Sequence, residues 1–326
     1  MSPTHLSRRC LLQTMLIAAT VPRARAAATE APRTLEALQL VVPAPPGSQP
    51  DLVARWLIEP MARRIGVHGS VVNRPGAAGA SAADAVLAAP PHSGALLLGG
   101  LDHVAYSHLN SQRRALDPFR DFLPVGAVNR DTWMVVVGAA SPVQSMSMLV
   151  EQSRQGAGLN FASTGEGSTA HLISARLVKA LGMQAQHVPY RDPWMPDLIA
   201  GRLHFVVAPT PAVIGQVRGG RLRALATLTD ARLALFEGVP SISELGWPDQ
   251  VFHGGLFLFA PAALGGHAER INDALLQALS QPDVQQHYRD AGIEITPLTL
   301  TQVAESVRQR LQAVDAMRLA VFGRSR

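Results

Sequence analysis

The sequence predicts an α/β protein, and three observations support that class. Short apolar runs such as LQLVV, WMVVVG and GLFLFA alternate with longer stretches of helical period. With 326 residues, of which 47% are hydrophobic and 16% charged, the chain can bury a large core and is long enough for two domains. Two strand, loop and helix units also lie about 120 residues apart. Since most runs are uniformly apolar, we expect parallel sheets with helices on both faces.

Residues 1–26 have the features of an export signal. Arg8 and Arg9 precede an apolar run over residues 10–21, and Ala24-Arg25-Ala26 supplies the small residues of a cleavage site. SRRCLLQ also has the order of a twin-arginine signal, although ordinary secretory signals carry arginine pairs too, so both routes stay open. We expect cleavage near Ala26 and a mature protein in the periplasm.

Removal of this signal changes two properties of the chain. Cys10 is the only cysteine, so the mature protein would have neither a disulfide nor thiol chemistry. The signal also contains four basic residues and no acidic ones, which leaves 25 basic against 24 acidic residues. This balance of +1, with scattered arginines, gives no reason to expect a nucleic-acid partner.

The first candidate loop is PAPPGSQPD, which follows a strand predicted at residues 38–42. In open α/β sheets, ligands bind outside the carboxyl ends of the strands. Asp51 is the expected N-cap of the next helix, whose positive end suits an anion. Prolines lack N–H groups, so those of Gly47, Ser48 and Gln49 are left to face a ligand. A stiff connector with a routine cap is the alternative.

The helix that follows this loop is expected to bury one face and to be interrupted once. Pro60 should end or kink it, because proline has no N–H group to donate. The residues expected on its buried side are Leu52, Val53, Trp56 and Leu57.

A second loop of the same kind lies in LNFASTGEGSTAHLISARLVKALG. The segment predicts a strand over residues 159–162, a small-residue loop, and a helix that stops at Gly182. Two such loops suit two domains that face each other across a cleft. Its candidate ligand groups are the hydroxyls of Ser163, Thr164, Ser168 and Thr169 and the N–H groups of Gly165 and Gly167.

Other chemistry finds weaker support in the sequence. GEGSTA fits the dinucleotide pattern G-x-G-x-x-A, but no acidic residue stands between Glu166 and Asp192 to bind a ribose. No G-x-S-x-G or H-E-x-x-H motif occurs, and the dispersed histidines predict no metal site. Asp102-His103 is either a catalytic pair or part of a loop. Arg191 either clamps a carboxylate or pairs with Asp192.

Eight blocks that follow one another along the mature chain carry a family resemblance. They are PAPPGSQPDLVARWL, VVNRPGAAGASAADAVLAAPPHSGALLLGG, DPFRDFLPV, FASTGEGSTAHL, HVPYRDPWMPDLIAGRL, GGRLRALATL, VPSISELGWPD and GGLFLFAPAAL. In this order they resemble the Bug family, the extracytoplasmic solute receptors of tripartite tricarboxylate transporters. The resemblance covers essentially the whole mature chain, and NRPGAAG and RLRALA are its most specific parts.

The resemblance implies a type II periplasmic-binding-protein fold with a ligand cleft between two lobes. Lobe 1 would combine residues 27–126 and 252–326, and lobe 2 residues 127–251. Family members typically hold a carboxylate with N–H groups, hydroxyls and waters of both loops. The ligand-binding residues implied here are Ala44, Pro46, Gly47, Ser48, Asp51, Ser163, Thr164, Gly165, Gly167, Ser168, Thr169, Arg191 and Ala208.

Several of these positions depart from the family's pattern. The family usually has Phe at Ala44, Gly at Ser48 and, within an Asp-Asn pair, an acid at Ala208. Loss of that acid argues against an amino-acid ligand and for a plain carboxylate. The segment RDPWM places Arg191 and Trp194 where the family has Lys-Gly-Ser-Gly-Pro, so an apolar ligand body against Trp194 is expected.

The expected function is therefore binding without chemistry, with neither a cofactor nor a metal. A small carboxylate would be captured between the lobes of a monomer and delivered to the membrane permease subunits of a tripartite transporter. Two alternatives remain, namely a receptor that feeds a sensor kinase and a twin-arginine-exported oxidoreductase with a nucleotide cofactor.

Overall fold

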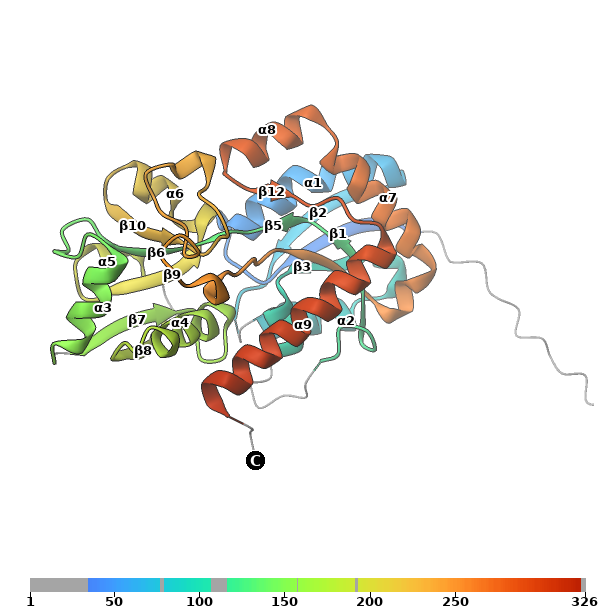
Figure 1. Ribbon diagram of the computed structural model, residues 1–326. Helices are drawn as coiled ribbons and strands as arrows, with labels where there is room; N and C mark the ends of the chain where they lie inside the picture. Colours follow the sequence, from blue (N-terminus) through green and yellow to red (C-terminus); the bar gives the residue numbers. More distant parts are fainter. Residues whose placement is uncertain (1–34, 77–78, 107–115, 157, 191–192, 324–326) are drawn as a thin grey trace, which may run out of the picture. The chain divides into compact units, whose positions relative to one another are not determined.

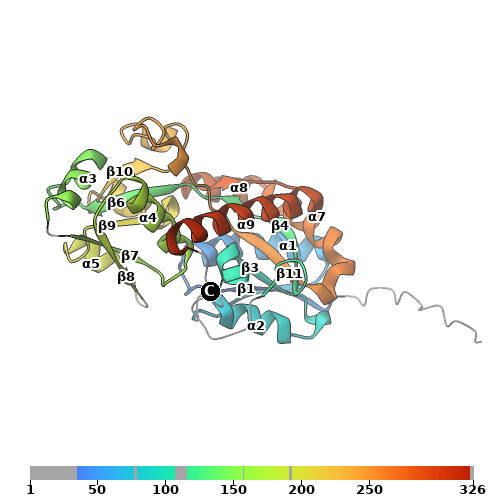
Figure 2. The same cartoon turned by 60° about the horizontal axis from the view of Figure 1, so that its bottom comes forward.

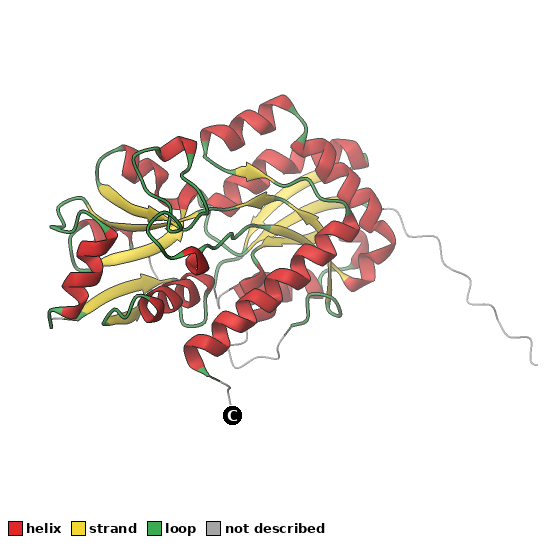
Figure 3. Cartoon of the chain, viewed as in Figure 1, coloured by secondary structure: helices red, strands yellow, loops and turns green. Residues whose placement is uncertain are grey.

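The computed structural model describes residues 35–76, 79–106, 116–156, 158–190 and 193–323, all within one compact unit. Two five-stranded sheets organise this unit (Figures 1 and 3). In order across the first sheet, the strands are β2 (His68–Asn73), β1 (Ala37–Val42), β3 (Ala95–Gly99), β11 (Phe257–Pro261) and β4 (Phe122–Ala127). Across the second they are β10 (Leu222–Thr227), β6 (Trp133–Gly138), β9 (Phe205–Pro209), β7 (Leu159–Ser163) and β8 (Ala185–Pro189).

Both sheets belong to the predicted α/β class, but they are mixed where parallel strands were expected. In the first sheet β11 runs antiparallel to β3 and β4, and in the second β6 runs antiparallel to β9 and β10. Each reversed strand is the first one that the chain enters after it crosses from one sheet to the other. An apolar strand buried on both faces has the same composition in either direction, so the sequence pattern does not reveal the reversal.

Helices cover both faces of each sheet, as predicted. On the first sheet, α1, α7 and α8 pack with Leu40 and Leu98 on one face, and α2 and α9 with Val41 and Leu97 on the other. The helices are α1 (Gln49–Ile65), α2 (Ala80–Ala88), α3 (Met146–Arg154), α4 (Thr169–Ala180), α5 (Met195–Ile199), α6 (Thr210–Arg218), α7 (Ala268–Leu279), α8 (Pro282–Asp290) and α9 (Leu300–Phe322). No helix among the described residues has the length and apolarity needed to cross a membrane.

Two short segments carry the chain between the sheets. The first contains β5 (Asn129–Arg130), which pairs with β12 (Glu294–Ile295). The second passes through Gly254, and the two segments meet in an antiparallel bridge in which Asp131 and Gly254 exchange N–H···O bonds of 3.1 and 2.9 Å.

Helix α9 contacts elements of both sheets. Val303 and Val307 are buried among residues of the first sheet, whereas Val314 and Met317 are buried in a cluster with residues of the second. Figures 1 and 2 both show α9 running from beside α7 to α4. The C-terminal end of α9 therefore belongs to the packing of the second sheet, although the lobe boundaries expected from the sequence assign it to lobe 1.

Helix α1 differs from its prediction in three respects. It begins at Gln49 with Ser48 as N-cap, so Asp51 lies in the first turn instead of capping it. It continues past Pro60 to Ile65, so Pro60 does not end the helix. Val53 and Leu57 are buried as expected, but Leu52 is 41% exposed, because the buried stripe follows Val53, Leu57 and Met61.

Candidate functional site

The loop between β1 and α1 is held in shape by hydrogen bonds within its own residues. Gly47 has φ of 79°, a left-handed conformation that glycine adopts without strain. Its N–H donates to Asp51 Oδ2 at 2.8 Å, and Ser48 Oγ donates to the Pro45 carbonyl at 2.6 Å. The Gly47 N–H was expected to face a ligand, but the structure gives it to Asp51.

Asp51 is the buried anchor of this loop. Only 1% of it is exposed, and its carboxylate also accepts hydrogen bonds from Arg55 Nε and Asn73 Nδ2, each at 3.0 Å. Burial alone would raise the pKa of Asp51, but the hydrogen bonds from Arg55, Gly47 and Asn73 and the charge of Arg55 lower it below its ordinary value. Asp51 is thus an ionised support for the loop, with its oxygens directed to internal donors.

The loop between β7 and α4 has the same architecture. Gly167 has φ of 74°, and its N–H donates to His171 Nδ1 at 3.0 Å. Ser168 is the N-cap of α4, and its Oγ accepts the His171 N–H at 3.3 Å and donates to the Gly165 carbonyl at 2.8 Å. Ser163 Oγ also bonds the Gly165 carbonyl, at 2.9 Å, so the loop closes tightly on itself.

Two stacked imidazoles support this second loop. The rings of His171 and His187 lie 3.7 Å apart between centroids with an interplanar angle of 11°, and His187 Nε2 is 2.7 Å from Ser163 Oγ. Burial and, secondarily, repulsion from His187 lower the pKa of His171 to about 4. Burial also lowers the pKa of His187, against the attraction of Glu166. Both rings are therefore neutral at pH 7, and His171 can accept the Gly167 N–H.

The two loops share one structural pattern. In each, a glycine with positive φ precedes a serine N-cap, and the glycine N–H donates to a side chain four residues further on. The pattern reads GSQPD in the first loop and GSTAH in the second. The anchor is a carboxylate in the first loop and a neutral imidazole in the second, so the second places less negative charge beneath its helix N-terminus.

Two residues expected near a ligand do not stand on the two loops. Ala208 is 2% exposed, and its side chain packs in a core cluster with Met134 and Val213. Trp194 is partly buried against the same cluster. Arg191 lies outside the described residues. The remaining expected residues stand on the two loops and the first turns of α1 and α4.

The first crossing segment connects both candidate regions, which the sequence did not indicate. Gln49, the first residue of α1, donates from Nε2 to Asp131 Oδ1 at 2.8 Å. The neighbouring Thr132 bonds Thr210, the first residue of α6, through both the hydroxyls and the main chain, each at 2.8 Å. Two consecutive residues of the crossing segment thus contact one helix N-terminus from each sheet.

Asp131 is a buried acid at this crossing. It is 5% exposed and accepts hydrogen bonds from Gln49 and, at 2.5 Å, from Asn129 Nδ2. Burial raises its pKa to about 6, although those hydrogen bonds and the charge of Arg310 oppose the rise. Arg310 comes from α9 and donates to the Gly254 carbonyl at 2.6 Å, so three elements meet here.

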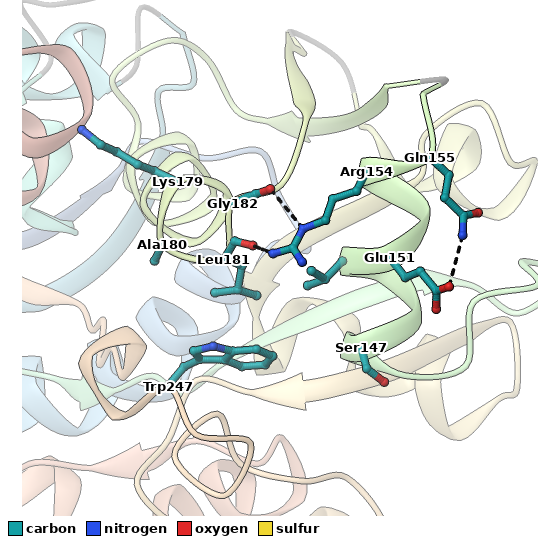
Figure 4. A pocket seen from close by; sticks show the side chains of 10 residues that line it. Ser147, Glu151, Arg154, Gln155, Lys179, Ala180, Leu181, Gly182 and Trp247 are labelled. Atoms are coloured by element: carbon teal, nitrogen blue, oxygen red, sulfur yellow. Dashed lines mark hydrogen bonds between the residues drawn. The ribbon is translucent and has the colours of Figure 1, made fainter.

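A surface depression of about 720 Å³ lies elsewhere, between α3, the C-terminal end of α4 and Trp247 (Figure 4). None of the expected ligand residues lines it. Its two cations are already engaged, because Arg154 donates to the Leu181 carbonyl at 2.7 Å and Lys179 to the Ala320 carbonyl at 2.6 Å. The depression is at the opposite end of α4 from Gly167, so we do not assign the ligand to it.

Comparison with known families decides the relationship of this chain. A model described as the tripartite tricarboxylate transporter family receptor matches residues 53–317. The chain belongs to this receptor family. The resemblance to Bug proteins is confirmed: BugT of Bordetella pertussis is 30% identical over 230 residues, covering 69% of this chain and 70% of BugT. The "UPF0065 protein in tcbD-tcbE intergenic region" of Pseudomonas sp. strain P51 is also 30% identical, over 94% of both chains.

Two solved structures confirm the fold. MatC of Rhodopseudomonas palustris, with bound malate, superposes with a TM-score of 0.78 at 24% identity and covers 86% of this chain and 98% of its own. Rpa4515 of R. palustris, with adipate, also gives a TM-score of 0.78, at 25% identity, over 86% of this chain and 96% of its own. The periplasmic-binding-protein fold expected from the sequence is therefore correct.

Proposed function

We propose that this protein is an extracytoplasmic receptor that captures a small carboxylate between two lobes and delivers it to a tripartite tricarboxylate-type membrane transporter. Lobe 1 comprises residues 27–126 and 252–326, and lobe 2 residues 127–251. The ligand occupies the cleft between them and is bound without chemistry. The observation that carries the proposal is the repeated loop, with one copy in each lobe.

Each of the two loops can present hydrogen-bond donors to an anion. Each stands at a helix N-terminus, where first-turn N–H groups lack intrahelical partners and the helix dipole favours negative charge. With the Gly47 and Gly167 N–H groups and the Ser48 hydroxyl bonded internally, the donors proposed for the ligand are the first-turn N–H groups of α1 and α4 and the hydroxyls of Thr164 and Thr169. Charge-assisted hydrogen bonds of this kind contribute roughly 1.5–3 kcal/mol each.

The comparisons support a carboxylate ligand. Two structures of similar fold hold malate and adipate, and both are dicarboxylates. His171, beneath the second loop, also favours an anionic ligand there. Its imidazole is neutral and would not repel a ligand carboxylate close to Gly167. We therefore propose that one carboxylate of the ligand lies against the second loop.

The cellular setting is part of the same proposal. The family model describes a transporter receptor, and the signal in residues 1–26, which lies outside the described residues, would export the chain to the periplasm. Delivery to a sensor kinase instead of a permease would use the same binding step. A nucleotide enzyme draws no support, since the GEGSTA loop gives its second glycine N–H to His171.

A thermal-shift screen on protein recovered from the periplasmic fraction of cells that express the full chain tests this function. Acetate, malate, adipate and citrate are the first probes. A ligand at one hundred times its Kd stabilises the native state by about 2.7 kcal/mol and raises Tm by several degrees. The intact mass of the same sample shows whether cleavage occurs near Ala26. No shift with any acid at millimolar concentration would refute carboxylate binding.

A further inference from the structure

His103 lies beside the first loop, at the carboxyl edge of the first sheet. Strands β1 and β3 are parallel neighbours with Val41 opposite Leu97, so the segments that follow them leave the sheet at the same edge. A short π-helical segment, Asp102–Tyr106, follows β3. A Cβ atom placed on Gly99 would come within 2.8 Å of His103 Nδ1 and 3.2 Å of Pro43 Cγ. The imidazole and the Pro43 ring therefore meet over Gly99.

A second glycine makes room for this imidazole on its other side. Gly79 is the N-cap of α2 with φ of 92°, and a Cβ atom there would collide with Cβ and the ring carbons of His103. The ring is thus wedged between the N-terminal end of α2 and the first residue of the PAPPGSQPD loop. The backbone at Gly79 and Gly99 restricts the ring on two sides, whereas a histidine on an open surface could rotate freely.

The hydrogen bonding of His103 fixes its tautomer. Nδ1 accepts the Gly100 N–H at 2.9 Å, so a neutral ring carries its proton on Nε2. Asp102 Oδ1 is 3.7 Å from Nδ1, which places the Asp102 carboxylate on the Nδ1 side of the ring. The side chain is 22% exposed, and Nε2 has no hydrogen-bond partner among the described residues. An oriented N–H donor is therefore left open on the edge of the ring that faces away from Gly100.

We propose that His103 determines affinity and specificity in the ligand site by donating a hydrogen bond from Nε2 to an oxygen of the bound carboxylate. This inference rests on the proposed function. The His103 side chain would supply a donor that the first loop lacks, because Gly47 already gives its N–H to Asp51. The buried Asp51 carboxylate also weakens the attraction of that loop for an anion.

Two substitutions of His103 test the roles of the two ring nitrogens separately. In His103→Asn the side-chain oxygen takes the place of Nδ1 and still accepts the Gly100 N–H, but no donor reaches the position of Nε2. In His103→Gln the longer side chain carries an NH₂ group to that position and gives up the bond to Gly100. We expect H103N to weaken binding by about tenfold or more and H103Q to recover most of that loss. His68→Asn, on exposed β2, is the matched control and should bind as the wild type does.

Binding is measured by titration with whichever of acetate, malate, adipate and citrate raises the wild-type Tm most. If the wild type responds to none of these acids, the proposed function fails and this inference fails with it. If the wild type binds and H103N binds equally well, only the role of His103 is overturned. Nitrogen NMR of the wild-type imidazole gives a variant-free check: the acid should shift the Nε2 resonance of His103, and an unchanged resonance would also contradict the role.

Discussion

The N–H of Gly167 donates to Nδ1 of His171 at 3.0 Å, which ties the second loop to the first turn of the helix that follows it. Gly47 and Asp51 make the corresponding bond, at 2.8 Å, in the first loop. One local design therefore presents a helix N-terminus in both halves of the molecule, with a different anchor in each. The chemistry of the anchors determines how the two loops respond to pH and to a bound anion.

Replacement of His171 should test the support of the second loop. His171→Ala leaves the buried Gly167 N–H without an acceptor, so we expect a loss of about 1–3 kcal/mol in the free energy of unfolding and weaker ligand binding. His171→Asn offers an oxygen near the position of Nδ1 and should retain most of both. Chemical denaturation and calorimetric titration of the two variants measure these effects. Equal behaviour of Ala and Asn would show that the Gly167 bond has little importance.

A charge introduced at Gly167 should exclude the ligand. Gly167→Asp and Gly167→Asn impose the same strain at φ of 74°, where both residues are tolerated better than most. Only Asp adds a carboxylate beside the place proposed for that of the ligand. We therefore expect the acid-induced rise in Tm to vanish in G167D and to persist, at reduced size, in G167N. A full ligand response in G167D would show that the loop does not face the ligand.

Asp131 and His171 should affect the pH dependence of stability in opposite directions. The folded state holds the Asp131 proton more tightly than the unfolded chain does, so its contribution is present below pH 4 and is lost as the pH rises to about 6. The pKa of His171 is lowered to about 4, so its contribution is present above pH 6.5 and is lost as the pH falls toward 4. Over the shared range the two trends partly cancel.

Asp131→Asn should separate these trends. The neutral amide avoids the cost of a buried charge, so the free energy of unfolding at pH 7 should increase by up to about 3 kcal/mol, the equivalent of two pKa units. Stability should then rise more steeply between pH 4 and 6 than in the wild type. Denaturation across that range measures both effects, with Asp283→Asn on the exposed start of α8 as control. Destabilisation of D131N at pH 7 would mean that the ionised form of Asp131 is required.

Gln49→Glu tests the link between α1 and the crossing segment. It places a second carboxylate against Asp131 Oδ1, which now accepts the Gln49 amide at 2.8 Å. Like charges at this separation repel strongly when buried, so the variant should be less stable than the wild type at pH 7 and regain stability near pH 5, where the pair can share a proton. Gln277→Glu, on the exposed face of α7, should show no such dependence. A pH-independent difference for Q49E would argue against direct contact in solution.

The sequence located the two loops because their signals are local. A strand, a glycine-containing loop and a serine before a helix are all adjacent in the chain, as for Ser168 and Thr169. Their internal bonding was not predicted, since either Gly47 or Gly167 could have donated to a ligand instead of to its anchor. The burial of Ala208 was also missed, because an alanine in an apolar strand carries no sign of which face it occupies.

Contacts between residues far apart in the chain could not be predicted from the sequence. Gln49 and Asp131 are 82 residues apart, and neither has a neighbour that marks it as a partner of the other. The same holds for the reversal of β6 and β11, which follows from the path of the chain between the sheets. Only the repeated pattern GSQPD and GSTAH offered an unused signal, since it predicts equivalent anchors at Asp51 and His171.

Native mass spectrometry of the protein recovered from the periplasm tests the central claim most directly. We expect one small carboxylic acid per chain, retained or added back from the panel of acids, and its loss in G167D but not in G167N. A chain that carries no acid under any of these conditions, or one that retains a nucleotide instead, would contradict the account.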